Sequence, residues 1–216
     1  MSPLKQHVPN VVWRVDIAAE RVVRDSAVQA MPVLRDTAQL ANWWGGSGVI
    51  WFAVVVWLGS RALRRQSVAR VGLRGVEALA IASGVSAILK GLAGRARPFV
   101  TPGEPWHFEL SRGWLEAQFC SMPSGHTTAT TACAVAMTLA LSQPLSQWRP
   151  ATRWALAVPL LATAIAVAFA RMYTNQHWLS DVVVAMVIGS TTALLLARVH
   201  AKRPSSRYDR AMLGSA

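Results

Sequence analysis

The sequence predicts an all-α protein, an integral-membrane bundle of about five transmembrane helices preceded by amphipathic helices. Hydrophobic residues make up 53% of the 216 residues and charged residues only 15%, which is too little charge to cover a soluble domain. From residue 43 onward the apolar residues gather into long runs. The basic residues behind the net charge of +12 flank those runs. This arrangement is typical of a membrane protein.

Residues 1–42 form a separate N-terminal region. Between positions 11 and 40, aliphatic residues alternate with charged ones, so no window there is apolar enough to cross a bilayer. Val15, Ala18 and Val22 recur at helical spacing. We expect one or two amphipathic helices, broken near Pro32, at the non-cytoplasmic membrane interface or against the bundle. The region lacks the apolar core and cleavage site of a secretory signal.

Residues 43–200 form the predicted membrane domain, followed by a basic tail at 201–216. The apolar runs cover approximately residues 44–60, 71–92, 127–145, 154–169 and 178–197. Each approaches the ~20 helical residues that cross about 30 Å of hydrocarbon. Several are rich in Ala, Gly and Thr, which favours close packing between helices in lipid. The alternative for these runs is the buried core of a soluble helical protein.

Basic residues set the predicted orientation. They crowd the connection after the first run, the connection after the third and the tail after the last: Arg61, Arg64, Arg65, Arg70, Arg74, Arg149, Arg153, Arg198, Lys202, Arg203, Arg207 and Arg210. The positive-inside tendency puts these segments and the C-terminus in the cytoplasm. The N-terminus and the connections 94–122 and 171–177 then lie on the opposite face. The membrane orientation explains the net positive charge, so this charge no longer supports nucleic-acid binding.

The segment that opens the third apolar run suits an anion. Ser124 and Gly125 stand at the start of a predicted helix, where a hydroxyl, free N–H groups and the positive end of the helix dipole face one small volume. His126 offers a proton donor or acceptor at its edge. The alternative is an ordinary helix entry with a histidine cap.

Lys90 and Arg97 end the second run on the non-cytoplasmic side. They are seven residues apart, which is two helical turns, so they can point the same way before Pro98 stops the helix. Snorkelling at a membrane edge is the alternative use of such cations. Their position on the face that the positive-inside tendency disfavours indicates a bound anion.

Arg171, His177 and Asp181 mark the connection before the last run. His177 and Asp181 are four residues apart at a predicted helix start, so they share a face. A carboxylate bound to one ring nitrogen fixes the tautomer and leaves the other nitrogen free to attack. A helix-start aspartate capped by its histidine is the alternative. No acidic cluster, HExxH pattern or Cys/His set predicts a metal site, so we expect no cofactor.

Together, Lys90-x6-Arg97-Pro98, Pro123-Ser124-Gly125-His126 and Arg171-x5-His177-x3-Asp181 resemble the three-part motif of the type 2 phosphatidic acid phosphatase and vanadium haloperoxidase superfamily. The resemblance implies that His177 attacks phosphorus while Asp181 holds its ring. It implies that His126 protonates the leaving oxygen and then activates water. Lys90, Arg97, Arg171, Ser124 and Gly125 would bind the phosphate. Ala170 stands where the family usually has Ser.

The resemblance and the topology imply a metal-independent phosphatase of the bacterial inner membrane, with its site on the periplasmic face. The expected substrate is a lipid phosphate or diphosphate of the undecaprenyl diphosphate, phosphatidic acid or phosphatidylglycerol phosphate type, and the expected inhibitor is vanadate. A haloperoxidase, a lipid phosphotransferase and a non-catalytic anion-binding membrane protein remain alternatives. The aromatic segment 106–115 is either a lipid-facing gate or an interface anchor. Cys120 and Cys133 are not expected to form a bridge.

Overall fold

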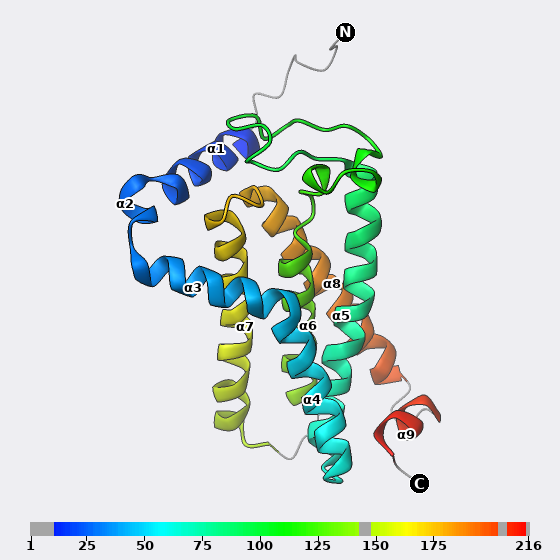
Figure 1. The fold of residues 1–216 in the computed structure, drawn as a ribbon. Helices are drawn as coiled ribbons and strands as arrows, with labels where there is room; N and C mark the ends of the chain where they lie inside the picture. The colour runs from blue at the N-terminus through cyan, green and yellow to red at the C-terminus, as the bar shows by residue number, and fades with distance from the viewer. Residues whose placement is uncertain (1–10, 143–147, 203–206, 215–216) are drawn as a thin grey trace.

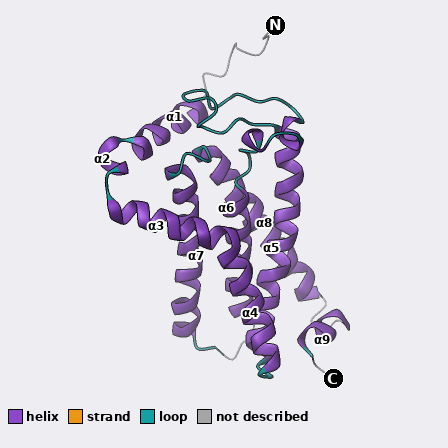
Figure 2. Ribbon diagram, viewed as in Figure 1, coloured by secondary structure: helices purple, strands orange, loops and turns teal. Residues whose placement is uncertain are grey.

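The computed structural model describes residues 11–142, 148–202 and 207–214. In this part of the chain the regular structure is helical, and the connections are loops and turns (Figure 2). The α-helices are α1 Val11–Arg24, α2 Ser26–Gln29, α3 Pro32–Trp43, α4 Val49–Ala62, α5 Gln66–Ala93, α6 Gly125–Leu141, α7 Pro150–Tyr173, α8 Leu179–Lys202 and α9 Arg207–Leu213. A π-helical turn, η1 Trp44–Gly48, joins α3 to α4, and two 3₁₀ turns, η2 Arg112–Trp114 and η3 Ala117–Phe119, lie in the long connection between α5 and α6.

The N-terminal region folds as helices, as the charge and apolar spacing predict. The chain breaks before Pro32, which then opens α3 from its first turn, where a missing N–H is tolerated. The helix does not break again at the predicted boundary between residues 42 and 43. Instead, α3, η1 and α4 form one helical run from Pro32 to Ala62. In Figure 1, α3 crosses α7 and α4 turns along the bundle, so the glycine-rich η1 is where the direction changes.

Four helical segments are long and apolar enough to cross a membrane: Pro32–Ala62, Gln66–Ala93, Pro150–Tyr173 and Leu179–Lys202. They contain four of the five predicted runs. The remaining run, 127–145, falls on α6, and its last residues lie outside the described part of the chain. At 17 residues, α6 is about 25 Å long and falls short of the hydrocarbon thickness. Its role as a fifth span stays a prediction.

The core forms around α6, which packs against α5, α7 and α8. Its buried face consists largely of Ala and Thr, including Ala132 and Thr128, both fully buried. Small residues let the backbones approach closely. A Cβ added at Gly189 of α8 would lie 2.8 Å from the carbonyl oxygen of Thr128. This close contact holds the first turn of α6 against the middle of α8. The two helix starts, where two of the predicted motifs lie, are joined by the Ser124 N–H, which donates to the Asp181 carbonyl at 3.2 Å.

The connections sort to the two ends of the bundle as the charge pattern predicts. Figure 1 shows α1, the long α5–α6 connection and the α7–α8 connection at one end. The α4–α5 connection, the start of α7 and α9 lie at the other end. All three motif segments therefore share one end, and the described basic connections share the opposite one.

The basic end carries an ion pair between Arg74 and Glu77, with 2.9 Å between Nη1 and Oε2. The structure extends this pair into a cluster. Arg74 Nη2 lies 2.7 Å from Oδ1 of Asp209 in α9, and His200 Nε2 lies 3.0 Å from Glu77 Oε2. The C-terminal helix is thus attached to α5 by buried charges rather than by apolar contact alone.

Candidate active site

The anion cradle predicted at Ser124 is a helix start. Gly125 is the first residue of α6, and Ser124 is its N-cap, fully buried. The N–H groups of the first turn therefore have no partner within the helix. The Ser124 hydroxyl lies 3.0 Å from the Thr127 hydroxyl, so the two side chains hydrogen-bond each other. The backbone of this turn, more than the serine side chain, is free to receive an anion.

His177 lies in the short connection between α7 and α8 and is almost fully buried. Its Nδ1 faces Oδ2 of Asp181 at 3.6 Å, just beyond hydrogen-bond distance, and no described group hydrogen-bonds that nitrogen. Burial lowers the pKa of His177 to about 3, although the Asp181 carboxylate acts in the opposite direction. The ring is therefore neutral at physiological pH, which is the state that has a lone pair for attack.

Asp181 sits in the first turn of α8 with no exposed surface. Its Oδ2 accepts hydrogen bonds from the Ser121 hydroxyl at 2.5 Å and from the Trp178 N–H at 2.9 Å. Its Oδ1 accepts one from Arg95 Nη1 at 2.5 Å. These donors hold the carboxylate in a single orientation, with Oδ2 toward His177.

Three cations converge on this end of the bundle, although not by the predicted geometry. The expectation that Lys90 and Arg97 share one helix is wrong, because α5 ends at Ala93 and Gly94 turns the chain with φ of 57°. Arg97 instead extends from the following loop. Both cations still act electrostatically on His126, as does Arg171, and the Lys90 and Arg171 charges also act on His177.

The cations have neutral partners. Lys90 Nζ donates to the Cys120 carbonyl at 2.7 Å, Arg171 Nη1 donates to Asn42 Oδ1 at 3.1 Å, and Arg97 Nη1 donates to Gln176 Oε1. The Nε groups of Arg97 and Arg171 are buried with no hydrogen-bond partner in the described part of the chain. Buried guanidinium donors are rarely left unpaired. Two in one place indicate a site that binds an anion.

A cavity of about 240 Å³ lies beside these groups, and Lys90, Gly125 and His126 line it. Its opposite wall belongs to η1, where a Cβ added at Gly46 would lie 3.2 Å from His126 Nε2. Ser86, whose buried hydroxyl has no hydrogen-bond partner in the described residues, also lines it. A phosphate group fits in this volume.

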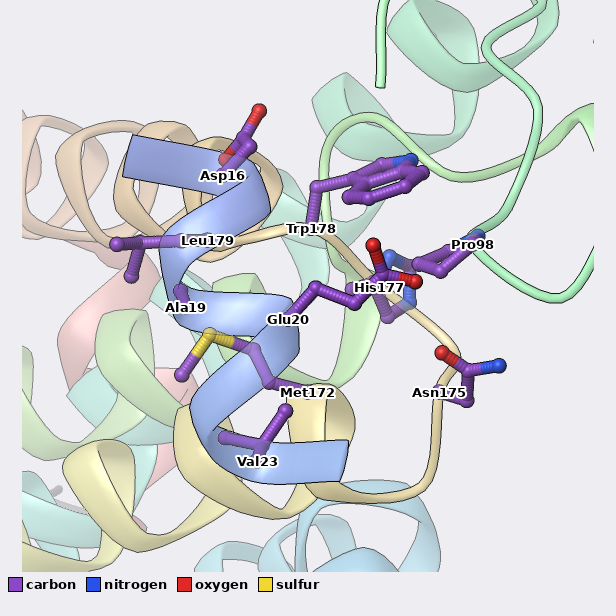
Figure 3. Close-up of a pocket in the computed structure, with 10 residues that line it drawn as sticks. All are labelled: Asp16, Ala19, Glu20, Val23, Pro98, Met172, Asn175, His177, Trp178 and Leu179. Carbon is purple, nitrogen blue, oxygen red and sulfur yellow. The ribbon is translucent and has the colours of Figure 1, made fainter. Parts of the chain in front are cut away.

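A second cavity lies behind His177 and has a volume of only about 10 Å³. Figure 3 shows Asp16, Glu20 and Val23 of α1 on one side of it and His177 and Trp178 on the other. It holds no more than about one water molecule. The N-terminal helix therefore packs beside His177, whereas the cavity of about 240 Å³ lies on the α6 side of the site.

Sequence reasoning assigned no role to several residues of this centre: Asp16, Asn42, Gly46, Ser86, Arg95, Ser121 and Gln176. Arg95 and Ser121 adjoin the motifs and were within reach of such reasoning. Asp16 and Asn42 come from the N-terminal helices α1 and α3, where the sequence shows only amphipathic spacing, and Gly46 comes from the glycine cluster of η1.

The aromatic segment between α5 and α6 is partly exposed. Leu110 and Leu115 are more than 80% exposed, and Trp114 is 56% exposed. His107 Nε2 lies 3.0 Å from Glu109 Oε1, so its ring is engaged within the segment. Both interpretations of this segment, as a gate or as an interface anchor, stay predictions. Cys120 and Cys133 are both free thiols, as expected.

Two histidines, three cations and a helix N-terminus thus gather at one end of an apolar helical bundle whose helices are long enough to cross a membrane. A family model described as the PAP2 superfamily matches residues 72–205, more than half of the sequence, and the chain belongs to this superfamily. This confirms the resemblance found in the motifs.

The fold matches a crystal structure described as the first transmembrane PAP2 type phosphatidylglycerolphosphate phosphatase, from Bacillus subtilis. The TM-score is 0.64 at 18% identity, and the match covers 92% of this chain and 90% of that one. At this identity the likeness is one of fold, and it confirms the all-α membrane bundle. No curated protein sequence matches the chain.

Proposed function

We propose that the protein is a metal-independent lipid phosphatase that hydrolyses a lipid phosphomonoester or diphosphate through a phosphohistidine. The observation that carries this proposal is the pair of buried guanidinium Nε groups of Arg97 and Arg171 that have no hydrogen-bond partner among the described residues, in the same centre as a buried neutral histidine. The family membership supports it, as does the activity in the description of the structurally similar bacterial protein.

In the proposed mechanism, His177 Nε2 attacks phosphorus while Asp181 faces Nδ1. The bond between phosphorus and the leaving oxygen breaks, and His126 gives that oxygen a proton. His126 then takes a proton from water, which attacks the phosphohistidine and releases phosphate. Lys90, Arg97 and Arg171 stabilise the charge on the phosphate oxygens, and the N–H groups of the first turn of α6 assist.

The position of the larger cavity supports a lipid substrate. Ile50 of α4 and Ala87 of α5 line it together with Lys90 and His126. Both helices belong to candidate membrane spans, and Ile50 is 44% exposed on the outer surface of the bundle. A phosphate bound at His126 would therefore leave its lipid chains room to extend between α4 and α5 into the bilayer.

Within this class we propose a bacterial inner-membrane enzyme with its site on the periplasmic face and its C-terminus in the cytoplasm. The basic residues at the end of the bundle opposite the site support this orientation. A topology reporter fused after Ala216 tests it, and a reporter that signals the non-cytoplasmic side contradicts it. Undecaprenyl diphosphate is the leading substrate, ahead of phosphatidic acid and phosphatidylglycerol phosphate.

The test is phosphate release by the purified protein from a panel of these lipids in mixed micelles. We expect release from at least one lipid and its loss in His177→Ala. His200→Ala is the matched control, because it removes an imidazole from the last turn of α8, beside Glu77 of the basic cluster. Transfer of phosphate to a second lipid instead of water identifies a phosphotransferase. Binding without turnover, or halide oxidation with bound vanadate, contradicts the proposal.

A further inference from the structure

A chain of buried charges joins the N-terminal helix to the carboxylate behind His177. Asp16 Oδ2 of α1 lies 2.8 Å from Arg95 Nη2, and Arg95 Nη1 lies 2.5 Å from Asp181 Oδ1. All three side chains are at most 1% exposed. Groups buried this deeply remain charged only when they are fully paired. Two buried ion pairs therefore link α1 to Asp181, the carboxylate that faces the proposed nucleophile.

Asp16 also caps the helix that carries Asp181. Its Oδ1 accepts the backbone N–H of Ser180 at 2.7 Å, and its Oδ2 accepts the Ser180 hydroxyl at 2.7 Å. Ser180 is in the first turn of α8, so a residue 164 positions away satisfies a free donor of that turn. Figure 3 shows Asp16 on α1, with Trp178 and Leu179 nearby in the lining of the small cavity. The position of α1 thus sets the position of Asp181.

Arg95 is held on every side. Its Nε donates to the Pro105 carbonyl at 2.8 Å, and Nη1 also reaches the Ser180 hydroxyl at 2.7 Å. Its guanidinium carbon lies 5.3 Å from the ring centre of Phe108. Arg95 therefore serves as a fixed donor to Asp181 rather than as a mobile ligand for phosphate, which separates it from Arg97 two residues later.

The charges explain why two carboxylates flank one arginine. When Nε2 of His177 bonds to phosphorus and Nδ1 keeps its proton, the ring becomes positive. Arg95 alone would cancel the Asp181 charge that stabilises this ring. With Asp16 present, the three groups carry a net charge of minus one, so the carboxylate that faces His177 remains effective in the dry interior.

We propose that Asp16 and Arg95 are positioning residues for phosphoryl transfer, acting on His177 through Asp181. Arg95 turns Oδ2 of Asp181 toward the ring, and Asp16 preserves the negative charge of the cluster and fixes the start of α8. The inference rests on the proposed phosphatase activity. Asp16 lies outside the residues that match the superfamily model, so the family match does not supply this role.

The test measures kcat and KM for Asp16→Asn, Arg95→Gln and the double variant, on the lipid that the wild-type protein hydrolyses. We expect each single change to lower kcat about 10- to 100-fold with KM changed less than about threefold, because the phosphate ligands are untouched. The double variant returns the cluster to a net charge of minus one. We expect it to be more active than either single variant.

Two further variants separate positioning from folding. Asp36 lies on α3, and its side chain is 72% exposed. Asp36→Asn removes this exposed carboxylate, so we expect unchanged kcat and an unchanged melting temperature. Ser180→Ala keeps every charge and removes one hydroxyl, so we expect a smaller loss of kcat than in Asp16→Asn even if the charge variants are unstable.

The inference is overturned if the losses in the two single variants multiply in the double variant, if kcat tracks the melting temperature, or if Ser180→Ala equals Asp16→Asn. These results leave wild-type phosphate release intact. If the wild-type protein and all variants release no phosphate, the proposed function fails instead.

Discussion

Replacing Gly46 with Ala tests whether the glycine turn of η1 keeps His126 in its working position. A Cβ at this residue would lie 3.2 Å from His126 Nε2, closer than the ~3.5 Å of an ordinary contact. The ring must therefore shift by a few tenths of an ångström. The backbone does not resist the change, because Gly46 has no left-handed φ.

The expected loss is kinetic. A displacement of about 1 Å in a catalytic group costs about 100-fold in rate, so we expect a loss of about tenfold in kcat from this smaller shift, or about 1.4 kcal/mol in the barrier. The thermal stability of Gly46→Ala should not fall with kcat. Replacing a helical glycine with alanine stabilises a helix by about 0.5–1 kcal/mol, so Gly46→Ala should unfold at the wild-type temperature or slightly above it.

Two glycines of the same helical run serve as controls. A Cβ at Gly59 meets nothing within 4 Å, so Gly59→Ala should keep full activity. A Cβ at Gly45 would lie 2.6 Å from Cγ1 of Val167, so Gly45→Ala should lose about 1–3 kcal/mol of stability through overpacking. Phosphate release and thermal unfolding are measured on all three. Wild-type kcat in Gly46→Ala, or a loss of kcat that accompanies a lower melting temperature, refutes the reasoning.

Three other outcomes are expected. Burial lowers the pKa of His177 from 6.5 to about 3, so the unfolded chain binds more protons between these values and stability falls as pH drops through that window. In His177→Gln the free energy of unfolding should fall less between about pH 7 and about pH 4.5 than in the wild-type protein. An equal fall in the two proteins contradicts a neutral buried ring. Asp209→Asn should lower the free energy of unfolding by about 1–3 kcal/mol, because Arg74 loses a buried partner. It should keep the wild-type kcat, because α9 lies at the end of the bundle opposite the site. A lower kcat with wild-type stability would contradict this expectation. Turnover should survive a metal chelator and stop with vanadate, whereas activity that a divalent cation restores after chelation argues for a metal.

Much of the site could be predicted from the sequence because its chemistry lies in short segments at helix ends. Ser124 and Gly125 start a helix, as Pro, Ser and Gly together indicate. His177 and Asp181 face each other as their four-residue spacing predicts, although His177 lies two residues before the start of α8 rather than within it. Lys90 and Arg97 lie at the same end of the bundle, as predicted, but they do not share a helix, because Gly94 in the left-handed conformation ends α5 between them.

Composition and local spacing by themselves determined the helical membrane class, the grouping of basic connections at one end and the identity of the motif residues. These properties depend on hydrophobicity and on the period of the α-helix, which the sequence contains directly. Only the tertiary structure decided that α1 packs behind His177, that Asp16 meets Arg95, and that Gly46 faces His126. The physical reason is that residue spacing shows which face of an amphipathic helix is apolar, but not which element that face packs against. Its docking depends on how the whole bundle packs.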